Sequence, residues 1–262
     1  MSKMLQKSLV GILMIAVALP ILIFGGIPLR IMLVVLLVMA AYEGTSLTDQ
    51  QPHYDLTVVS AAAMIGLAFV PDAYTAVVLA ALITVMFTLI LFDENKTTDM
   101  VVYSVLISII CGLGVRSVIR LYAGSDSEGF RTMMYICIAC FGCDTGAYFA
   151  GVRFGKHKMI PRISPNKTWE GAVGGYLAGA VGSFVFAYFL INRLPMPMII
   201  TGSLLLPAAA EIGDLSFSSL KRRFQIKDFS NLFPGHGGIL DRVDSILFCL
   251  MVFQCLLTIW GL

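Results

Sequence analysis

Charged residues are scarce in this sequence. They make up 13% of its 262 residues, whereas hydrophobic residues make up 58%, and soluble domains carry about 25% charged residues. The shortage extends over the whole length, so there are too few charges to cover a large aqueous surface. The composition excludes a soluble globular protein with a single anchor and predicts an integral membrane protein.

A surplus of charge of either sign is also missing. The formal net charge is only +2, which is too small for the broad basic surface that nucleic-acid binding requires. We therefore expect no nucleic-acid partner. Only three histidines are present, so histidine-based acid–base chemistry has few candidates.

A disulfide framework is absent as well. The six cysteines all lie in apolar runs. Cys137, Cys140 and Cys143 have a spacing seen in iron–sulfur ligand runs, but no fourth cysteine or histidine lies nearby. We interpret them as small packing residues of a membrane helix.

Long apolar runs are what the sequence has in abundance. A spanning helix needs about 20 mainly apolar residues, and nine segments qualify or nearly qualify. The sequence therefore predicts an all-α, polytopic membrane helix bundle with about nine transmembrane helices. The candidate spans are Leu9–Phe24, Pro28–Tyr42, Leu56–Val70, Tyr74–Phe92, Met100–Val115, Thr132–Gly151, Gly171–Ile191, Met198–Phe217 and Ser245–Leu262.

The polar residues are distributed unevenly between two halves. Residues 1–131 carry little chemistry, and connections such as 43–55 and 93–99 have the composition of solvated loops. We predict an N-terminal transmembrane bundle there, serving as scaffold and facing lipid. Residues 132–262 are predicted to form the catalytic transmembrane region, with polar loops at 153–170 and 218–244. The first apolar run follows Lys3 and Lys7 but has no convincing signal-peptide cleavage site, so we expect it to be retained.

Basic residues predict the orientation of the bundle. If the N-terminus is cytoplasmic, alternating spans place 13 of the 18 Lys and Arg residues on the cytoplasmic side, as the positive-inside tendency favours. Both polar loops then face the cytoplasm. We expect a multi-pass protein of the cell (inner or plasma) membrane with its active site on the cytoplasmic face.

Ionisable groups inside spans are costly and are functional candidates. Asp144 lies between Gly142 and Gly146, which predict a close-packed helix, and the same helix leads into the first polar loop. The alternative is a carboxyl hydrogen-bonded to a neighbouring helix. In that loop, Ser164 and Pro165 suit a helix start.

The same loop offers ligands for an anion. Asn166 and Lys167 are natural sugar and phosphate contacts. A plain positive-inside loop with Trp169 as an interfacial anchor explains the composition equally well.

A polar stripe marks the eighth span. Glu211, Asp214, Ser218 and Lys221 occur at i, i+3, i+7 and i+10 and therefore share one helix face. A carboxylate pair within a membrane repels itself unless a metal or proton is present, which favours a cation site. A salt-bridged stripe between helices is the alternative.

Two more acids open the last span. Asp241 and Asp244 are three residues apart and bracket Arg242. With Asp214 on a neighbouring helix they would make an oxygen-rich site of the kind that suits Mg²⁺, which binds through one or two carboxylates plus substrate phosphates. N-terminal helix capping is the alternative interpretation.

The stretch from Ser218 to Asp244 resembles the signature of the CDP-diacylglycerol synthases, also called phosphatidate cytidylyltransferases. The matching residues are Ser218, Lys221-Arg222, Lys227-Asp228, Pro234, His236-Gly237-Gly238, Asp241-Arg242 and Asp244. The segment Ser164 to Gly171 and the helix of Asp144 are also similar to that family. The convincing similarity covers residues 132–262.

This resemblance implies an enzyme of phospholipid biosynthesis that converts CTP and phosphatidate into CDP-diacylglycerol and pyrophosphate. It implies that Asp144, Asp214, Asp241 and Asp244 hold Mg²⁺, with a second cation left open. Basic groups neutralise the triphosphate and the lipid phosphate, and His236 contacts pyrophosphate or nucleotide. The implied catalytic residues are Asp214, Lys221, Arg222, Asp241, Arg242 and Asp244, and the implied substrate-binding residues are Ser164, Asn166, Lys167, Lys227, Asp228, His236, Gly237 and Gly238.

Other functions stay open from the sequence. A CTP-dependent kinase or cytidylyltransferase for another lipid would need the same phosphate chemistry. A cation-coupled transporter would place its ion at Asp144, Glu211 and Asp214. Small-residue faces such as Gly171–Gly182 permit helix contacts within or between subunits, so a homodimer is also left open.

Overall fold

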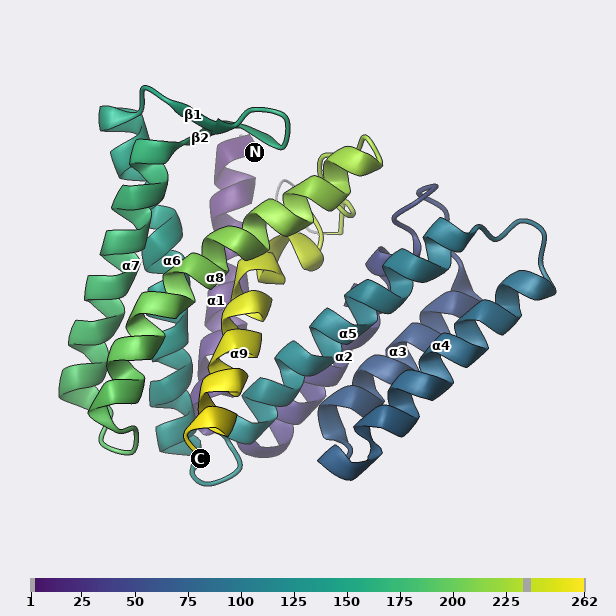
Figure 1. The fold of residues 1–262 in the computed structure, drawn as a ribbon, viewed down its shortest axis with the longest axis horizontal. Helices are drawn as coiled ribbons and strands as arrows, with labels where there is room; N and C mark the ends of the chain where they lie inside the picture. Colours follow the sequence, from purple (N-terminus) through teal and green to yellow (C-terminus); the bar gives the residue numbers. More distant parts are fainter. Residues whose placement is uncertain (1–2, 233–236, 262) are drawn as a thin grey trace. The chain divides into compact units, whose positions relative to one another are not determined.

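The computed structural model describes residues 3–232 and 237–261, and most of these lie in helices (Figure 1). Each of the nine apolar segments expected from the sequence coincides with one α-helix of the described residues. The elements are α1 (Lys3–Phe24), α2 (Gly26–Thr45), α3 (Tyr54–Phe69), the short 3₁₀ helix η1 (Asp72–Tyr74), α4 (Thr75–Leu91), α5 (Thr98–Leu121), α6 (Asp126–Phe154), β1 (Lys158–Ile160), β2 (Ser164–Thr168), α7 (Trp169–Leu190), α8 (Met196–Arg223) and α9 (Leu240–Ile259).

Most of these helices are long and apolar enough to cross a bilayer. Within the described ranges, seven segments meet that condition, and Gly11–Phe24 and Tyr54–Phe69 are shorter apolar helices. The expected all-α polytopic membrane bundle is confirmed. The finer count of nine crossings stays a prediction.

The chain divides into two compact units. The first unit contains Met1–Ile119 together with Arg223–Val243, and the second contains Arg120–Arg222 together with Asp244–Leu262. The segment 223–243, which carries half of the signature, thus belongs with the N-terminal helices. The sequence-based division at residue 131 stays a prediction.

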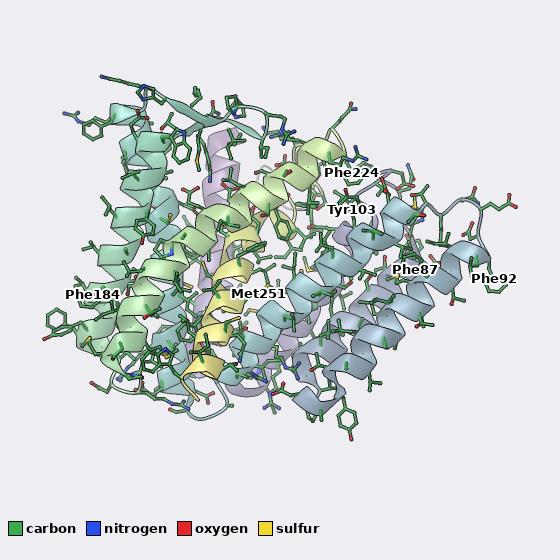
Figure 2. The ribbon with its side chains drawn as sticks, in the orientation of Figure 1. Phe87, Phe92, Tyr103, Phe184, Phe224 and Met251 are labelled. Atoms are coloured by element: carbon green, nitrogen blue, oxygen red, sulfur yellow. The ribbon has the colours of Figure 1, made fainter. Side chains whose placement is uncertain are left out.

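The first unit has an apolar core between α3, α4 and α5. Its buried members include Leu56, Leu82, Met86 and Val101. Phe87 of α4 and Phe92, the residue that follows α4, are exposed, as expected of side chains in contact with lipid tails or the membrane interface (Figure 2). The unit therefore combines a packed interior with an apolar exterior, as a membrane bundle must.

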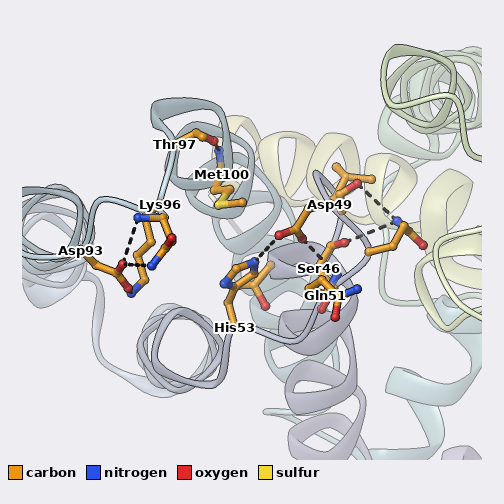
Figure 3. A network of polar contacts seen from close by, with 12 residues as sticks. Ser46, Asp49, Gln51, His53, Asp93, Lys96, Thr97 and Met100 are labelled. Atoms are coloured by element: carbon orange, nitrogen blue, oxygen red, sulfur yellow. Dashed lines mark hydrogen bonds and ion pairs between the residues drawn. The ribbon is translucent and has the colours of Figure 1, made fainter.

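Polar contacts tie the connections of the first unit together at one end. Lys96, between α4 and α5, lies 2.6 Å from Asp55 at the start of α3 and also pairs with Asp93. His53 pairs with Asp49 at 2.9 Å in the connection between α2 and α3 (Figure 3). These loops were expected to be merely solvated, but the Lys96 side chain is only 7% exposed. Its carboxylate partners stabilise the buried ammonium.

The segment after α8 is fixed to this same unit. Phe224 packs edge-to-face on Tyr103 of α5, with ring centroids 4.9 Å apart (Figure 2). Arg223 lies 3.8 Å from Asp99. The ends of the segment 218–244 are helical, because α8 continues to Arg223 and α9 begins at Leu240. Among the described residues of this segment, those outside the two helices are therefore 224–232 and 237–239.

The second unit is built on close packing of α6 against α7. A Cβ added to Gly146 would lie 2.5 Å from Ala178 Cβ, and one added to Gly175 would collide with the carbonyl oxygen of Cys143. The expected close-packed helix around Asp144 is confirmed. The small-residue face of α7 is used within the chain, and a homodimer stays a prediction.

Helix α8 joins this pair through a buried hydrogen bond. The Tyr135 hydroxyl of α6 donates to the Ile199 carbonyl of α8 at 2.9 Å.

The six cysteines are free thiols, and Cys137, Cys140 and Cys143 are buried. Their expected role as packing residues is confirmed.

A small β-hairpin connects α6 to α7 and lies beyond the ends of these two helices (Figure 1). Its strands are antiparallel, with Lys158 opposite Thr168 and Ile160 opposite Ser164. The expectation that Ser164 and Pro165 start a helix is wrong. They lie in β2, and α7 begins five residues after Ser164, where the Thr168 hydroxyl accepts a hydrogen bond from the Gly171 N–H at 3.1 Å. A threonine that caps a helix in this way satisfies one of its free N–H groups.

Candidate active site

Lys167 organises the polar cluster of the second unit. It stands near the end of β2, and its ammonium lies 2.6 Å from Glu211 Oε2 and 2.6 Å from Asp214 Oδ2, both on α8. The Lys167 side chain is 20% exposed. Burial works to lower the pKa of Lys167, but Asp214 and Glu211 outweigh it and raise the pKa above its usual value. The lysine therefore stays charged at neutral pH.

This contact corrects one step of the sequence argument. The Glu211–Asp214 pair was expected to need a metal or a proton, because two nearby carboxylates repel each other. In the structure the Lys167 ammonium lies between them and supplies the compensating charge. The expected common face of α8 is confirmed, since one cation reaches both acids and Ser218 Oγ lies 3.4 Å from Asp214 Oδ1.

Two further acids surround this pair. Asp144 of α6 interacts electrostatically with Asp214, Lys167 and Glu211. Asp244 of α9 interacts with Asp214, Lys221 and Asp144. The structure thus brings together the predicted residues Asp144, Lys167, Asp214, Lys221 and Asp244 from three helices and the hairpin. We call these five residues, together with Glu211, the acidic–basic cluster.

The charges of the acidic–basic cluster do not balance. It holds four carboxylates but only two ammonium groups, those of Lys167 and Lys221. Lys221 is only 8% exposed. Like charges held this close raise the electrostatic energy, so the cluster favours the arrival of a further cation.

Other predicted residues of the second unit lie at its surface. Asn166 and Arg222 are exposed, and Ser164 is half-buried. The Arg222 Nε donates to the Ile163 carbonyl at 3.2 Å, which connects the end of α8 to the hairpin. These side chains are placed to meet a ligand that approaches along the hairpin.

In the first unit, Asp241 connects two parts of the segment 223–243 by hydrogen bonds. Its Oδ2 accepts hydrogen bonds from the Phe229 N–H at 2.8 Å and the Gly238 N–H at 2.9 Å. Neither donor belongs to α9 (Leu240–Ile259), so these bonds connect residues 229 and 238, and the capping alternative weighed for Asp241 stays a prediction. Asp241 and Asp244 are one helical turn apart in α9 but belong to different units, and the expectation that Asp241 shares a metal with Asp214 stays a prediction.

Glycine is required at both positions of the Gly237-Gly238 pair. Gly237 has φ of +78°, and a Cβ there would lie 2.8 Å from Asp241 Oδ2. A Cβ on Gly238 would collide with the carboxylate of Glu43. Residues other than glycine rarely adopt a positive φ. A Cβ at either position would also come too close to the neighbouring carboxylate. The signature glycines therefore allow the backbone to approach two carboxylates.

Sequence reasoning missed Glu43. It was assigned to a solvated connection, but it lies in the last turns of α2 and is 1% exposed. Its carboxylate accepts hydrogen bonds from Ser230 Oγ at 2.6 Å and from the N–H groups of Ile239 and Leu240, each at 2.9 Å. The sequence does show an acid at the end of an apolar span. An ionisable group in that position is a functional candidate for the same reason as Asp144.

The remaining predicted residues are placed less specifically. Lys227, Asp228 and Arg242 are exposed. His236 lies outside the described residues. Among the residues that the structure does describe, no group of three or more His, Cys, Asp or Glu side chains is arranged so that it could hold a metal ion.

Comparison with known proteins decides what this geometry belongs to. The family model described as "Cytidylyltransferase family" matches residues 5–260. This chain belongs to the cytidylyltransferase family. The resemblance noted in the signature is therefore confirmed, and membership extends over both halves of the chain rather than over residues 132–262 alone.

Individual relatives of the cytidylyltransferase family agree with this assignment. The chain is 32% identical to the phosphatidate cytidylyltransferase of Bacillus subtilis (strain 168), over all of both chains. It is 31% identical to that of Staphylococcus haemolyticus (strain JCSC1435), over 96% of this chain and 98% of the relative. The enzyme of the same name from Haemophilus influenzae is 40% identical over 148 residues, which cover 55% of this chain and 51% of the relative.

Proposed function

We propose that this chain transfers the cytidylyl group of CTP to phosphatidate at the cytoplasmic face of the cell membrane. A phosphate oxygen of the lipid bonds to the α-phosphorus of CTP, the bond from that phosphorus to the bridging oxygen breaks, and pyrophosphate leaves. The products are CDP-diacylglycerol and pyrophosphate. The observation that carries the proposal is the acidic–basic cluster in a chain of this family, and the full-length relatives named phosphatidate cytidylyltransferase support it.

The nucleophile needs no base from the protein. The second pKa of a phosphate monoester is about 6, so phosphatidate reaches neutral pH already ionised. The two histidines that the structure describes are each paired with an acid, His53 with Asp49 and His157 with Glu170. The task left to the protein is to bring two anions together in line, which rests on positioning and charge stabilisation.

The cationic side chains perform that task. Lys167 is held in place by Glu211 and Asp214, so its ammonium is preorganised rather than free to rotate. Lys221 is buried in the same cluster. A positioned ammonium in a partly buried site stabilises a developing phosphate charge more strongly than one in water. Arg222 and Arg242, which are exposed, are suited to the outer phosphates of CTP.

The acids of the cluster fit Mg²⁺ by their chemistry. Mg²⁺ prefers oxygen ligands and binds through one or two carboxylates, several waters and substrate phosphates. Asp144, Asp214 and Asp244 supply such oxygens, and the excess of negative charge in the cluster favours a cation. Because no three His, Cys, Asp or Glu side chains of the described residues are arranged to hold a metal ion by themselves, we propose that the triphosphate contributes most of the ligands. Bound Mg²⁺ would supply charge neutralisation at the phosphates.

Pyrophosphate release by the purified protein tests the activity. Release is expected only when CTP, phosphatidate and Mg²⁺ are all present. Release with an isoprenoid alcohol in place of phosphatidate would instead point to another lipid substrate. Cation-dependent uptake by liposomes without CTP turnover would point to a transporter. Either result would overturn the proposal.

Cysteine labelling in intact cells tests the orientation. In a Cys255→Ser background, a membrane-impermeant thiol reagent should miss Lys158→Cys in the hairpin and reach Asn192→Cys in the connection between α7 and α8. The opposite pattern would place the hairpin outside and contradict a site that uses cytoplasmic CTP.

A further inference from the structure

The Glu43 carboxylate accepts hydrogen bonds from two separate parts of the segment 223–243. We call residues 229–230 its first stem and residues 238–240 its second stem. On one stem it accepts from Ser230 Oγ at 2.6 Å, and on the other from the N–H groups of Ile239 and Leu240 at 2.9 Å. Asp241 makes a second such connection, because its Oδ2 accepts hydrogen bonds from both the Phe229 N–H and the Gly238 N–H. Two acids thus hold residues 229–230 against residues 238–240.

The surroundings of Glu43 are unusual for an acid. The side chain is 1% exposed, and its three hydrogen-bond donors are a hydroxyl and two backbone N–H groups rather than a cation. Burial of a carboxylate is costly unless hydrogen bonds compensate. The N–H groups belong to the start of α9, where the helix dipole favours a negative charge. The hydrogen bonds and the helix dipole therefore both compensate the burial of the Glu43 carboxylate at this place.

Gly238 makes the contact specific. It lies so close to Glu43 that any Cβ would collide with the carboxylate. The acid and the glycine are 195 residues apart in sequence, yet the carboxylate can occupy its position only because residue 238 has no side chain. A helix cap alone would need no glycine at this position.

We propose that Glu43 is a positioning residue for the cytidylyl transfer. It fixes Gly238 and the first turn of α9, and so sets where Asp241 and Arg242 are presented to the substrates. This inference rests on the proposed function. Glu43 acts through the backbone that it holds and does not touch the reacting atoms.

The expected effect of losing the carboxylate follows from its hydrogen bonds. In Glu43→Gln, the amide offers one acceptor oxygen, and its NH₂ group confronts a donor. At least one buried N–H of Ile239 or Leu240 then loses its partner. Small displacements of groups that orient substrates cost up to about 100-fold in rate. We expect kcat to fall roughly 10- to 100-fold, with a smaller change in the KM for phosphatidate.

Two measurements on the full-length protein in detergent test this. Hydrogen exchange of the Ile239 and Leu240 amides should be faster in Glu43→Gln than in the wild type. Pyrophosphate release should show the fall in kcat per folded molecule. The matched control is Asp49→Asn, which removes an acid just after α2 that pairs with His53, and it should match the wild type in both measurements.

The outcomes separate the inference from the function on which it rests. If the wild type releases no pyrophosphate from CTP and phosphatidate, the proposed function fails, whatever the exchange shows. If the wild type is active, unchanged exchange in Glu43→Gln overturns the inference. Faster exchange or a lower melting temperature with wild-type kcat also overturns it, because Glu43 would then serve stability alone.

A compensating pair covers the case in which Glu43→Gln does not fold. Gly238→Ala places a methyl group against the carboxylate, and Glu43→Asp shortens the acid by one methylene. The double variant Gly238→Ala/Glu43→Asp should have a higher kcat than Gly238→Ala alone. An equal or lower kcat would contradict the proposed contact.

Discussion

The Lys167 ammonium lies 2.6 Å from Glu211 Oε2 and 2.6 Å from Asp214 Oδ2 and so binds two acids of α8 at once. This relationship joins the hairpin to the helix and keeps a charged lysine inside the acidic–basic cluster. It also removes the repulsion between two acids on one helix face. The lysine thus holds the cluster together before any substrate arrives.

Replacing Lys167 with methionine should remove most of the activity. The change leaves Glu211 and Asp214 facing each other without a cation and takes one positive charge from the phosphates. We expect kcat/KM to fall by at least about 100-fold, the scale found when one positioned donor is removed from a transition state. Steady-state pyrophosphate release measures this.

The control for that variant restores the charge balance. In the double variant Lys167→Met/Glu211→Gln, one acid is neutralised, so stability should recover towards the wild type while activity stays low. Equal activity of Lys167→Met and the wild type would show that the lysine has only a structural role.

Asp214→Asn and Asp244→Asn test the proposed metal ligands. Each should lower kcat by roughly 100-fold or more and raise the Mg²⁺ concentration needed for half-maximal rate, because an amide is a weaker ligand than a carboxylate. Titration of the rate with Mg²⁺ separates the two effects. Asp126→Asn, at the first turn of α6, provides a control that should titrate like the wild type. Near-normal turnover with unchanged Mg²⁺ dependence would remove the varied acid from the metal site.

The raised pKa of Lys167 predicts how stability depends on pH. Burial opposes the shift, but Asp214 and Glu211 raise the pKa above its usual value near 10.5. The folded protein therefore holds this proton more tightly than the unfolded chain. The contribution is fully present below the unfolded pKa and is lost as pH rises through the folded pKa.

Thermal unfolding in detergent checks this sign. The difference in melting temperature between the wild type and Lys167→Met should be constant from pH 7 to 9 and should shrink above about 10.5. A difference that grows with pH in this range would contradict the assigned direction.

The contact between α6 and α7 predicts a sharp difference between two glycines. A Cβ at Gly175 would collide with the Cys143 carbonyl, whereas a Cβ at Gly182 would meet only Ile138 Cγ2, at 3.4 Å. Gly175→Ala should therefore destabilise the second unit by about 1–3 kcal/mol, the usual cost of overpacking. Gly182→Ala is the matched control and should be close to neutral. Thermal unfolding of both variants decides whether the backbone contact limits side-chain size.

The sequence predicted the helices well because hydropathy depends on composition alone. It also predicted the common face of Glu211 and Asp214, which follows from 3.6 residues per turn. It failed where a partner comes from far away in the chain. Neither the Lys167 contact across 44 residues nor the Glu43 contacts to the start of α9 leave a local pattern.

The start of α7 shows a different kind of failure. Ser164-Pro165 and Thr168 are both acceptable starts for a helix by composition. Pairing of β2 with β1 extends the backbone through Ser164, so the later residue becomes the cap. Strand pairing between short segments depends on a turn and a register that local propensity does not determine.

The position of Glu43 has a consequence for biosynthesis. This acid emerges from the ribosome 196 residues before Ile239, whose N–H donates a hydrogen bond to it in the folded protein. During that interval α2 has entered the bilayer without the donors that its carboxylate needs. The start of α9 must therefore be made before the Glu43 carboxylate can gain the N–H groups of Ile239 and Leu240, and a chain cut short before Ile239 would leave it with one of its three donors, Ser230 Oγ.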